Sequence, residues 1–378
     1  MSRKIKVLQL QYRYHAGISD LAEQAIHGLP HVQFDITTAF LCGTRQPDEP
    51  NSHAQRTVHF DFSKSSLAGL RLRVLWRLYR FCRDERFDVI IAHRFKPISI
   101  VMMLSRLLDI PLCIGVQHRI GDFDRSYRKV QARWFLRSNW RVVGVSRAVR
   151  DYLLGCGAGL TADNTVLINN AIDIQQAEKL QHPKLRAREL LGLPTDAFIF
   201  GTIGRLVPVK RHIHLIQAFA RVHERYPNAM VAIIGEGRAR GDLEAGIRQH
   251  GLEGRVVLLG SRDCALQYAR AYDVFVMPSF SEGLPMALLE GMTARLPIIA
   301  SDIDSMRSIV EDAGGHLFKV EDVDELAARL ECMLQADPDD LKEEGERAYA
   351  YLQRAHKIED FRSQYRDLIL DSMPAQRV

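Results

Sequence analysis

Short apolar runs alternate with longer amphipathic segments along most of the 378-residue chain. Seven runs in the first half predict β-strands: 5–10, 34–39, 57–60, 89–92, 112–116, 140–145 and 166–168. Several of them are apolar throughout, which is typical of strands buried on both faces of a parallel sheet. Amphipathic segments between them predict helices, among them 18–28, 67–87, 97–108 and 126–138. Strands joined by helical crossovers indicate a doubly wound α/β domain.

The alternation of strands and helices is interrupted at residues 174–197. This segment is polar, contains Pro183 and Pro194, and is predicted to form one short helix. The alternation restarts with predicted strands at 198–203, 230–234, 256–259, 274–277 and 298–300. We therefore predict two domains, 1–180 and 181–357, and a final amphipathic helix in 358–378 that crosses back to the first domain. Two doubly wound domains are expected to face each other across a cleft at the carboxyl ends of their strands, where ligands bind.

Composition is that of a globular protein, with 47% hydrophobic residues and no apolar run near the ~20 residues of a membrane span. The first residues read as a strand and not as a signal peptide. Six cysteines occur without a C-x-x-C pair. This pattern predicts reduced thiols, no structural zinc and a cytoplasmic location.

Positive charge is concentrated in the first half. Residues 61–151 contain nineteen Lys/Arg and eight Asp/Glu, whereas the whole chain has a net charge of only +5. Such asymmetry indicates an anionic partner for the first domain. The segment 67–87 is an arginine-rich helix with Trp76, Tyr79 and Phe81, and a second basic group lies in 125–137. These segments suit an anionic membrane surface or a phosphorylated acceptor. A crossover helix with a solvated basic face explains the first of them equally well.

The stretch 278–302 carries the candidate chemistry of the second half. A strand is followed by a loop with Glu282, by Pro285 at a helix start, and by a helix that contains Glu290. A helix N-terminus beside a loop suits an anionic ligand. Eight helical positions span roughly 12 Å, whereas the two carboxylates of a retaining glycosidase lie about 5 Å apart. The two glutamates are therefore expected to contact two parts of one extended ligand.

Other candidates follow strands. Arg205 and Lys210 lie in the loop after 198–203, where they can neutralise a diphosphate. Gly235 begins a G-x-G sequence, but Arg240 stands where a dinucleotide fingerprint needs its third glycine, so this fingerprint fails. In the first half, Gly17 opens the loop after the first strand and His118 follows the strand 112–116.

Taken in order, the motifs GRLVPVK, IIGEGR, VVLLG, YDVFVMPSFSEGLPMALLEGM and PIIASD resemble those of the retaining, nucleotide-sugar-dependent glycosyltransferases of family 4 (glycosyl transferases group 1). The first half is similar through Gly17, His118, VGVSRAV and LINNAID. The resemblance implies the GT-B fold, with two Rossmann-like domains facing a cleft. It further implies a sugar transfer from a nucleotide diphosphate sugar, such as a UDP-sugar, without a metal ion or other cofactor. Chain length and motif style are similar to those of bacterial lipopolysaccharide core transferases.

The resemblance also implies roles for individual residues. Arg205 and Lys210 would bind the donor diphosphate, Glu290 the ribose, and Glu282 and His118 the transferred sugar. Gly17, Gly235 and the backbone of Gly283 and Leu284 would approach the sugar or the phosphates, and Arg262 would lie beside the base. No nucleic-acid partner is implied. Two D-x-D spellings, at 122–124 and 302–304, are interpreted as loop acids and not as metal ligands.

The sequence departs from the family pattern in four loops. Ala16 precedes Gly17, Ala171 follows Asn170, Arg211 follows Lys210, and Met306 and Arg307 replace a common Pro-Glu pair. These departures affect loop shape and sugar choice and leave the charged donor-binding residues in place. Two alternative functions remain open at this point: a UDP-sugar 2-epimerase of related fold, and a non-catalytic sugar- or polyanion-binding protein.

Overall fold

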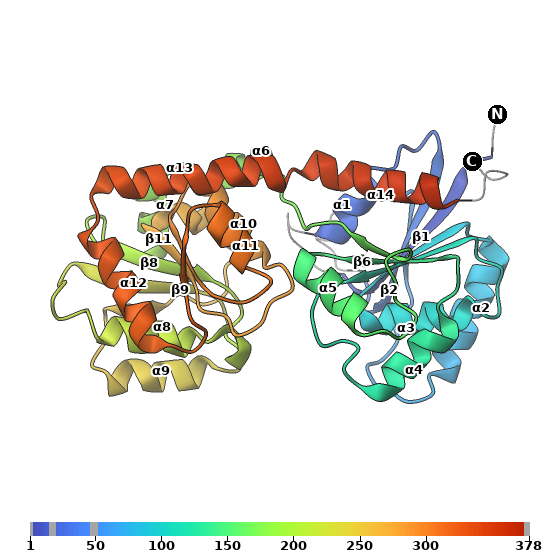
Figure 1. The fold of residues 1–378 in the computed structure, drawn as a ribbon, viewed down its shortest axis with the longest axis horizontal. Coiled ribbons are helices and arrows are strands. Elements are labelled where there is room, and N and C mark those ends of the chain that lie inside the picture. Colours follow the sequence, from blue (N-terminus) through green and yellow to red (C-terminus); the bar gives the residue numbers. More distant parts are fainter. Residues whose placement is uncertain (1–2, 15–19, 46–51, 374–378) are drawn as a thin grey trace. The chain divides into compact units, whose positions relative to one another are not determined.

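The computed structural model describes residues 3–14, 20–45 and 52–373. The chain forms two compact units, which we call unit 1 (Met1–Asn170 with Ile358–Val378) and unit 2 (Ala171–Lys357). The boundary lies ten residues before the predicted one, because α6 (Ile174–Leu180) packs against α10 and η2 of unit 2. Figure 1 shows that each unit has a central sheet with helices around it.

Unit 1 contains one parallel sheet of seven strands in the order β3-β2-β1-β4-β5-β6-β7. Its strands are β1 (Ile5–Arg13), β2 (Phe34–Cys42), β3 (Arg56–His59), β4 (Val89–His93), β5 (Leu112–Gln117), β6 (Trp140–Gly144) and β7 (Thr165–Leu167). The order reverses between β1 and β4, which confirms the predicted doubly wound sheet. β1 is three residues longer than predicted, because its pairing with β2 continues to Arg13 and Cys42.

The helices of unit 1 are α1 (Leu21–His27), α2 (Leu72–Glu85), α3 (Phe95–Leu104), α4 (Ser126–Phe135), α5 (Arg147–Gly155) and α14 (Ile358–Ser372). α2 begins five residues later than predicted, after Arg71, whose φ of 54° is left-handed. α5 is capped by Ser146, whose side chain accepts the Val149 N–H at 3.2 Å.

The last helix, α14, belongs to unit 1 and packs on α1 (Figure 1). Gly28 follows α1 and allows this close approach, since a Cβ there would lie 2.3 Å from the Arg362 carbonyl oxygen. The Arg362 guanidinium donates to Gln24 Oε1, at 2.9 Å from Nε.

Unit 2 contains a parallel sheet of six strands in the order β10-β9-β8-β11-β12-β13. Its strands are β8 (Phe198–Ile203), β9 (Ala229–Ile234), β10 (Val256–Leu258), β11 (Val274–Met277), β12 (Ile298–Ser301) and β13 (His316–Phe318). Its helices are α6, α7 (Lys184–Leu191), α8 (His212–Ala220), α9 (Arg240–Gln249), α10 (Met286–Thr293), α11 (Arg307–Asp312), α12 (Val323–Gln335) and α13 (Pro338–Ala355), with 3-10 turns η1 (Pro208–Lys210) and η2 (Ala265–Ala271). The order reverses between β8 and β11.

The segment 174–197 differs from its prediction, because it forms two helices, α6 and α7. Arg188 on α7 is only 2% exposed. Its guanidinium donates to Asp273 at 2.7 Å and to the Ala271 carbonyl at 2.8 Å, both beside β11. A buried, fully bonded arginine thus fixes a segment that looks like a solvated linker in the sequence. A further difference is that α11 forms over Arg307–Asp312, where no helix was predicted.

Each sheet is covered on both faces, and the core of unit 2 includes Phe200, Leu215, Phe219, Val231 and Leu330. In the ranges that the structure describes, no helix is both long and apolar enough to cross a bilayer.

Candidate active site

The candidate site of unit 2 lies where the strand order reverses, between the neighbouring strands β8 and β11. Loops leave the carboxyl ends of these two strands in opposite directions, and this is where ligands bind in doubly wound sheets. The loop after β8 carries Arg205 and Lys210, and the loop after β11 carries Glu282. The fold therefore places all three residues at one edge of the sheet.

Lys210 and Glu282 form an ion pair that joins the two loops. Lys210 Nζ lies 2.7 Å from Glu282 Oε1, and the side chains are 15% and 13% exposed. A second link is the Phe280 N–H, which donates to the Val209 carbonyl at 2.8 Å. Because both charges are largely withdrawn from water, the attraction between them is screened less than that of a surface ion pair. The ion pair therefore holds an ammonium group and a carboxylate next to each other at this edge of the sheet.

The basic residues near this ion pair differ in whether their side chains are already paired or are able to bind an anionic ligand. Arg211 has a left-handed φ of 51°, pairs with Glu321 at 2.5 Å, and lies 5.3 Å from the centre of the Phe280 ring. Arg205 is exposed and joins no side-chain hydrogen bond or ion pair within the described ranges. His212 is buried, and burial, followed by the charge of Lys210, lowers its pKa to about 3. Lys210 and Arg205 are thus the cations presented at this edge.

Helix α10 begins beside Glu282. Pro285 occupies its N-cap position and no side chain caps the helix, so its first N–H groups are not held by a capping oxygen. Gly283 and Leu284 are buried directly before it. Glu290 is half-buried farther along α10. The structure therefore places Glu282 ahead of the helix and Glu290 on its body.

Gly235 and Gly237 allow two backbone segments to approach closely. A Cβ at Gly235 would lie 1.8 Å from the Gly204 carbonyl oxygen, and one at Gly237 would lie 2.3 Å from the Leu206 carbonyl oxygen. The Gly235 N–H donates to the Gly260 carbonyl at 2.9 Å. Gly235 thus shapes the loop that carries Arg205, and its own N–H is already used.

Arg262 lies two residues after Gly260, is exposed, and forms no side-chain bond among the described residues. The same segment reaches α10 through Cys264. Burial raises the pKa of the Cys264 thiol, a hydrogen bond from the Gln267 backbone opposes this shift, and the Glu290 carboxylate adds to it. Arg262 and Glu290 therefore belong to neighbouring parts of one surface of unit 2.

In unit 1, His118 follows β5 and faces His93, the last residue of β4. His93 Nδ1 lies 3.4 Å from His118 Nε2, and the ring centres are 5.6 Å apart. Burial, and secondly the charge of Arg94, lowers the pKa of His118 to about 3. Burial also lowers the pKa of His93 well below its usual value, with His118 as the next cause. Both imidazoles are therefore neutral at physiological pH. Gly17, the other candidate of this half, lies outside the described residues.

Sequence reasoning did not identify His93 or His212, nor the pairing of Lys210 with Glu282. His93 offered one signal, since it ends an apolar strand neighbouring the strand that His118 follows. The ion pair joins loops 72 positions apart, and no local pattern predicts such a contact.

Two family models match the chain. The model described as "Glycosyl transferases group 1" matches residues 184–350, and the model described as "Glycosyltransferase Family 4" matches residues 17–176. Together they account for most of the chain and for both units. The chain belongs to the GT-B glycosyltransferases of family 4. This membership confirms the resemblance drawn from the motifs.

Relatives of this glycosyltransferase include the UDP-Gal:alpha-D-GlcNAc-diphosphoundecaprenol alpha-1,3-galactosyltransferase of Escherichia coli, which is 25% identical over 339 residues, or 85% of this chain and 86% of the relative. The 2-deoxystreptamine glucosyltransferase of Streptomyces kanamyceticus is 28% identical over 297 residues, or 74% of this chain and 75% of the relative.

Solved structures show the same fold. The sucrose-phosphate synthase of Thermosynechococcus elongatus superposes with a TM-score of 0.81 at 18% identity, over 97% of this chain and 99% of that one. HepE of Anabaena, in complex with UDP, gives 0.78 at 19% identity, over 97% and 100% of the chains.

The acids of the two D-x-D spellings of the glycosyltransferase contact other side chains. Asp302 and Asp304 both pair with Arg307, Asp122 pairs with Arg119 at 2.8 Å, and Asp124 accepts from Tyr152. Among the residues with described positions, no group of three or more His, Cys, Asp or Glu side chains is arranged to hold a metal ion.

Proposed function

We propose that this glycosyltransferase transfers a hexose from a UDP-sugar to a cell-envelope glycolipid, with retention of anomeric configuration and without a metal ion or other cofactor. The observation that carries the proposal is the Lys210–Glu282 pair at the edge of β8 and β11, with Arg205 in the same loop as Lys210. A cation and a carboxylate held together suit the junction between a diphosphate and a sugar. The cation can bind the negatively charged diphosphate, and the carboxylate can accept hydrogen bonds from the sugar hydroxyls.

In this mechanism the bond between the anomeric carbon and the diphosphate oxygen breaks, and negative charge develops on the leaving diphosphate. Arg205 donates to it through a planar fork, and Lys210 contributes a point charge. Glu282 accepts from sugar hydroxyls, Glu290 binds the ribose, and Arg262 lies against the base. The acceptor hydroxyl attacks the anomeric carbon from the face that the diphosphate leaves, and the proton of this hydroxyl passes to the departing phosphate. This route needs no protein nucleophile and leaves Glu282 in its ion pair.

Unit 1 contributes uncharged groups to the donor. A neutral His118 can donate or accept a hydrogen bond with a sugar hydroxyl without placing a charge beside the oxocarbenium-like carbon. Its partner His93 fixes the ring. Gly17, also in the first half of the chain, is proposed to approach the donor diphosphate.

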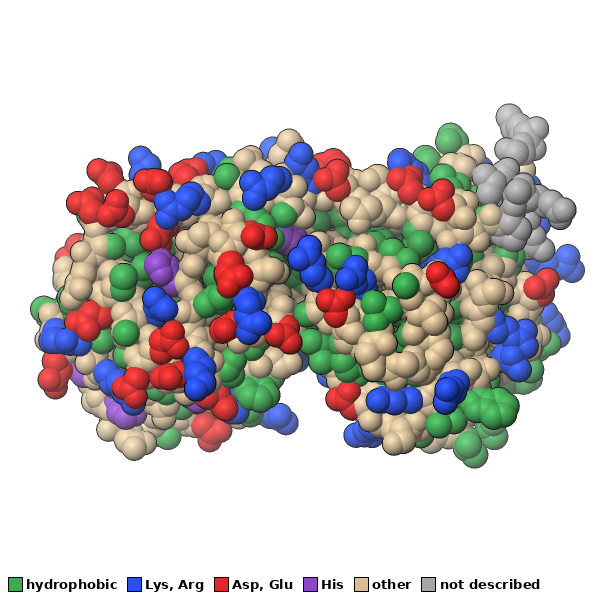
Figure 2. All heavy atoms as spheres, viewed as in Figure 1, with side chains coloured by type: hydrophobic (Ala, Val, Ile, Leu, Met, Phe, Trp, Pro, Cys, Tyr) green, Lys and Arg blue, Asp and Glu red, His purple; other side chains and the backbone are tan. Residues whose placement is uncertain are grey.

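The acceptor is proposed to be a phosphate-bearing glycolipid at the cytoplasmic face of the inner membrane. The lipopolysaccharide core is the acceptor suggested by the sequence, and the name of the E. coli relative specifies a diphosphoundecaprenol-linked sugar. Apolar side chains stand out among cations on α2 and α4, with Trp76 57% and Trp134 70% exposed. Figure 2 shows hydrophobic side chains beside Lys and Arg on the end of unit 1 that carries these helices. Such a surface suits an anionic bilayer.

The test is a transfer assay with the purified protein, a panel of UDP-sugars, and two acceptors: lipopolysaccharide core and a diphosphoundecaprenol-linked sugar. We expect UDP release that requires both a donor and an acceptor, and a product with the anomeric configuration of the donor. Epimerised UDP-sugar without acceptor would contradict transfer, and inversion in the product would contradict retention.

A further inference from the structure

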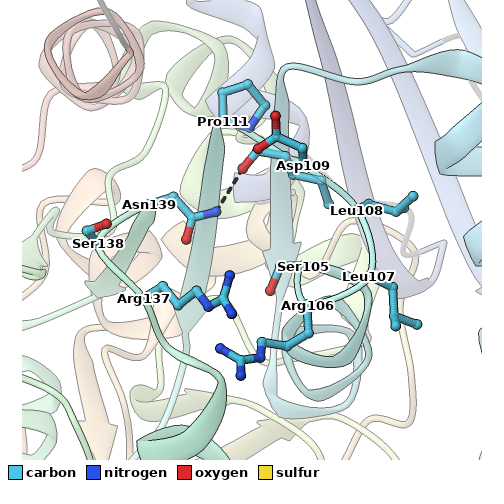
Figure 3. A pocket seen from close by; sticks show the side chains of 10 residues that line it. Ser105, Arg106, Leu107, Leu108, Asp109, Pro111, Arg137, Ser138 and Asn139 are labelled. Carbon is cyan, nitrogen blue, oxygen red and sulfur yellow. Dashed lines mark hydrogen bonds between the residues drawn. The ribbon is translucent and has the colours of Figure 1, made fainter.

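A pocket of about 530 Å³ opens in unit 1 at the edge of the sheet opposite to His118. Its lining comes from the segment between α3 and β5 (residues 105–111) and from the segment between α4 and β6 (residues 137–139) (Figure 3). Both segments precede their strands, whereas His118 follows β5. The pocket therefore lies outside the donor-binding machinery described above.

The walls of the pocket are held by buried contacts. Trp140, which is fully buried, donates from its indole Nε1 to Ser105 Oγ at 3.3 Å, and Ser105 Oγ donates to the Met102 carbonyl at 3.0 Å. Asn139 Nδ2 donates to the Ile110 carbonyl at 2.7 Å and joins the two segments. The pocket thus has a fixed shape, and its volume falls within the range of small-molecule sites.

Two arginines, Arg106 and Arg137, extend into this pocket from its two sides (Figure 3). Neither guanidinium forms a hydrogen bond or ion pair with any residue that the structure describes. Asp109 also lines the pocket, but it lies at the other end, beside Pro111, and is not paired with either arginine (Figure 3). Most arginines on the helices of unit 1, by contrast, contact a carboxylate, a carbonyl or an aromatic ring, as Arg77, Arg128 and Arg150 do. Two adjacent cations without a counter-charge repel each other, and an anion between them relieves this repulsion.

We propose that Arg106 and Arg137 form a phosphate-binding site that is separate from the donor site. Two guanidinium forks that reach one space from opposite walls offer several N–H donors to a tetrahedral anion, and such bonds are short and charge-assisted. The ligand is a phosphate ester of small size. Leu107, 68% exposed on the rim, gives the site an apolar margin. The phosphate belongs either to a lipid headgroup or to a free phosphorylated compound.

The deciding experiment is a titration of the full-length protein with inorganic phosphate, followed through the indole N–H signal of Trp140 in a ¹H–¹⁵N spectrum. The chain has three tryptophans, so Trp76→Phe and Trp134→Phe assign the signal without altering the buried ring. This signal reports on the pocket through Ser105 and not on unit 2. We expect a saturable shift.

The pocket variant is Arg106→Gln/Arg137→Gln, and the matched control is Arg13→Gln/Arg147→Gln, which removes two exposed cations of the same unit that lie outside the basic segments 67–87 and 125–137. Loss of each charge-assisted contact should weaken phosphate binding about tenfold, so the pocket variant should bind about a hundredfold more weakly. The control should change binding less than about twofold. All four arginines are exposed, so both proteins should fold. An absent shift in the wild type, or an equal loss in the control, would overturn the proposal.

Vesicles distinguish the two sources of the phosphate. If the site binds a headgroup, the pocket variant should sediment less than the control with phosphatidylglycerol vesicles, and neither should sediment with phosphatidylcholine vesicles. If the ligand is a free compound, the two variants should sediment alike, while only the pocket variant loses the phosphate-dependent shift. The proposal does not rest on the transferase reaction, so a failed transfer assay leaves it intact.

Discussion

The two units use the carboxyl edges of their sheets differently. Unit 2 places charges there, in Arg205, the Lys210–Glu282 pair and Glu290. Unit 1 places two neutral imidazoles at the same edge, His93 and His118, and carries its excess of cations on α2, on α4 and in the pocket at the opposite edge. Two sheets of the same construction are therefore specialised by the loops that follow their strands.

This difference has a physical reason in the proposed reaction. A leaving diphosphate gains negative charge, and fixed cations stabilise it most when they are withdrawn from water. The sugar carbon gains positive charge, and a cation beside it would oppose the reaction. The cations of unit 2 and the neutral imidazoles of His93 and His118 in unit 1 meet these two requirements separately.

The largest effect is expected from Lys210. Replacing it with Ala removes a cation from the diphosphate and leaves the Glu282 carboxylate without its counter-charge. We expect kcat/KM for transfer to fall about a hundredfold or more. The control is Arg221→Ala, which removes an exposed unit 2 arginine paired with Asp324 and should change kcat/KM less than about twofold. Comparable losses in the two variants would show that the Lys210 site has no special role.

Glu290 tests the contact with the nucleoside. Its exchange for Gln keeps the shape and removes the charged acceptor for the ribose hydroxyls, so the Kd for UDP should rise about tenfold. Titration calorimetry with UDP and with inorganic pyrophosphate separates the contribution of the nucleoside from that of the diphosphate. The Glu290→Gln variant should bind pyrophosphate as tightly as the wild type does. Unchanged UDP binding would mean that Glu290 does not contact the ribose.

The neutral imidazole of His118 leads to a prediction about pH. With its pKa lowered to about 3, His118 is uncharged throughout the range from pH 5 to 8, because a base is neutral above its pKa. The exchange His118→Gln keeps a neutral hydrogen-bonding group, so we expect kcat/KM to fall only about fivefold. The pH profile should keep its shape. A limb near pH 6.5 that disappears in this variant would show that the imidazole titrates during the reaction.

The smallest effect is expected from the exposed tryptophans. Trp76→Ala and Trp134→Ala should each weaken binding to phosphatidylglycerol vesicles about threefold, since each removes part of an interfacial aromatic contact. Transfer to a water-soluble acceptor fragment should stay the same. Tyr226→Ala, which removes a partly buried ring of unit 2, is the control for vesicle binding. Equal vesicle binding by all variants would exclude these side chains from a membrane contact.

Much of this architecture could be predicted from the sequence, because strands buried on both faces leave continuous apolar runs. The runs that became β8 and β11 were located to the residue, and Ile358–Ser372 was predicted with its observed ends. Family motifs then indicated which loop residues to consider. Those motifs occupy contiguous stretches, so a single sequence displays them.

What the sequence could not predict depends on contacts between distant segments. α7 looks polar until Arg188 is seen buried against Asp273. The Lys210–Glu282 pair needs the β8–β11 pairing to bring its loops together. Arg106 was not singled out, because one arginine in a loop carries no signal until Arg137 is seen on the facing segment.

The central claim is that the charged edge of unit 2 binds the diphosphate of the donor. Titration calorimetry of UDP into the wild type and into Arg205→Gln/Lys210→Gln tests this claim most directly. We predict that the double variant binds UDP about a hundredfold more weakly, because two charge-assisted contacts to the diphosphate are lost, while uridine binding changes little. An unchanged Kd for UDP would contradict the account.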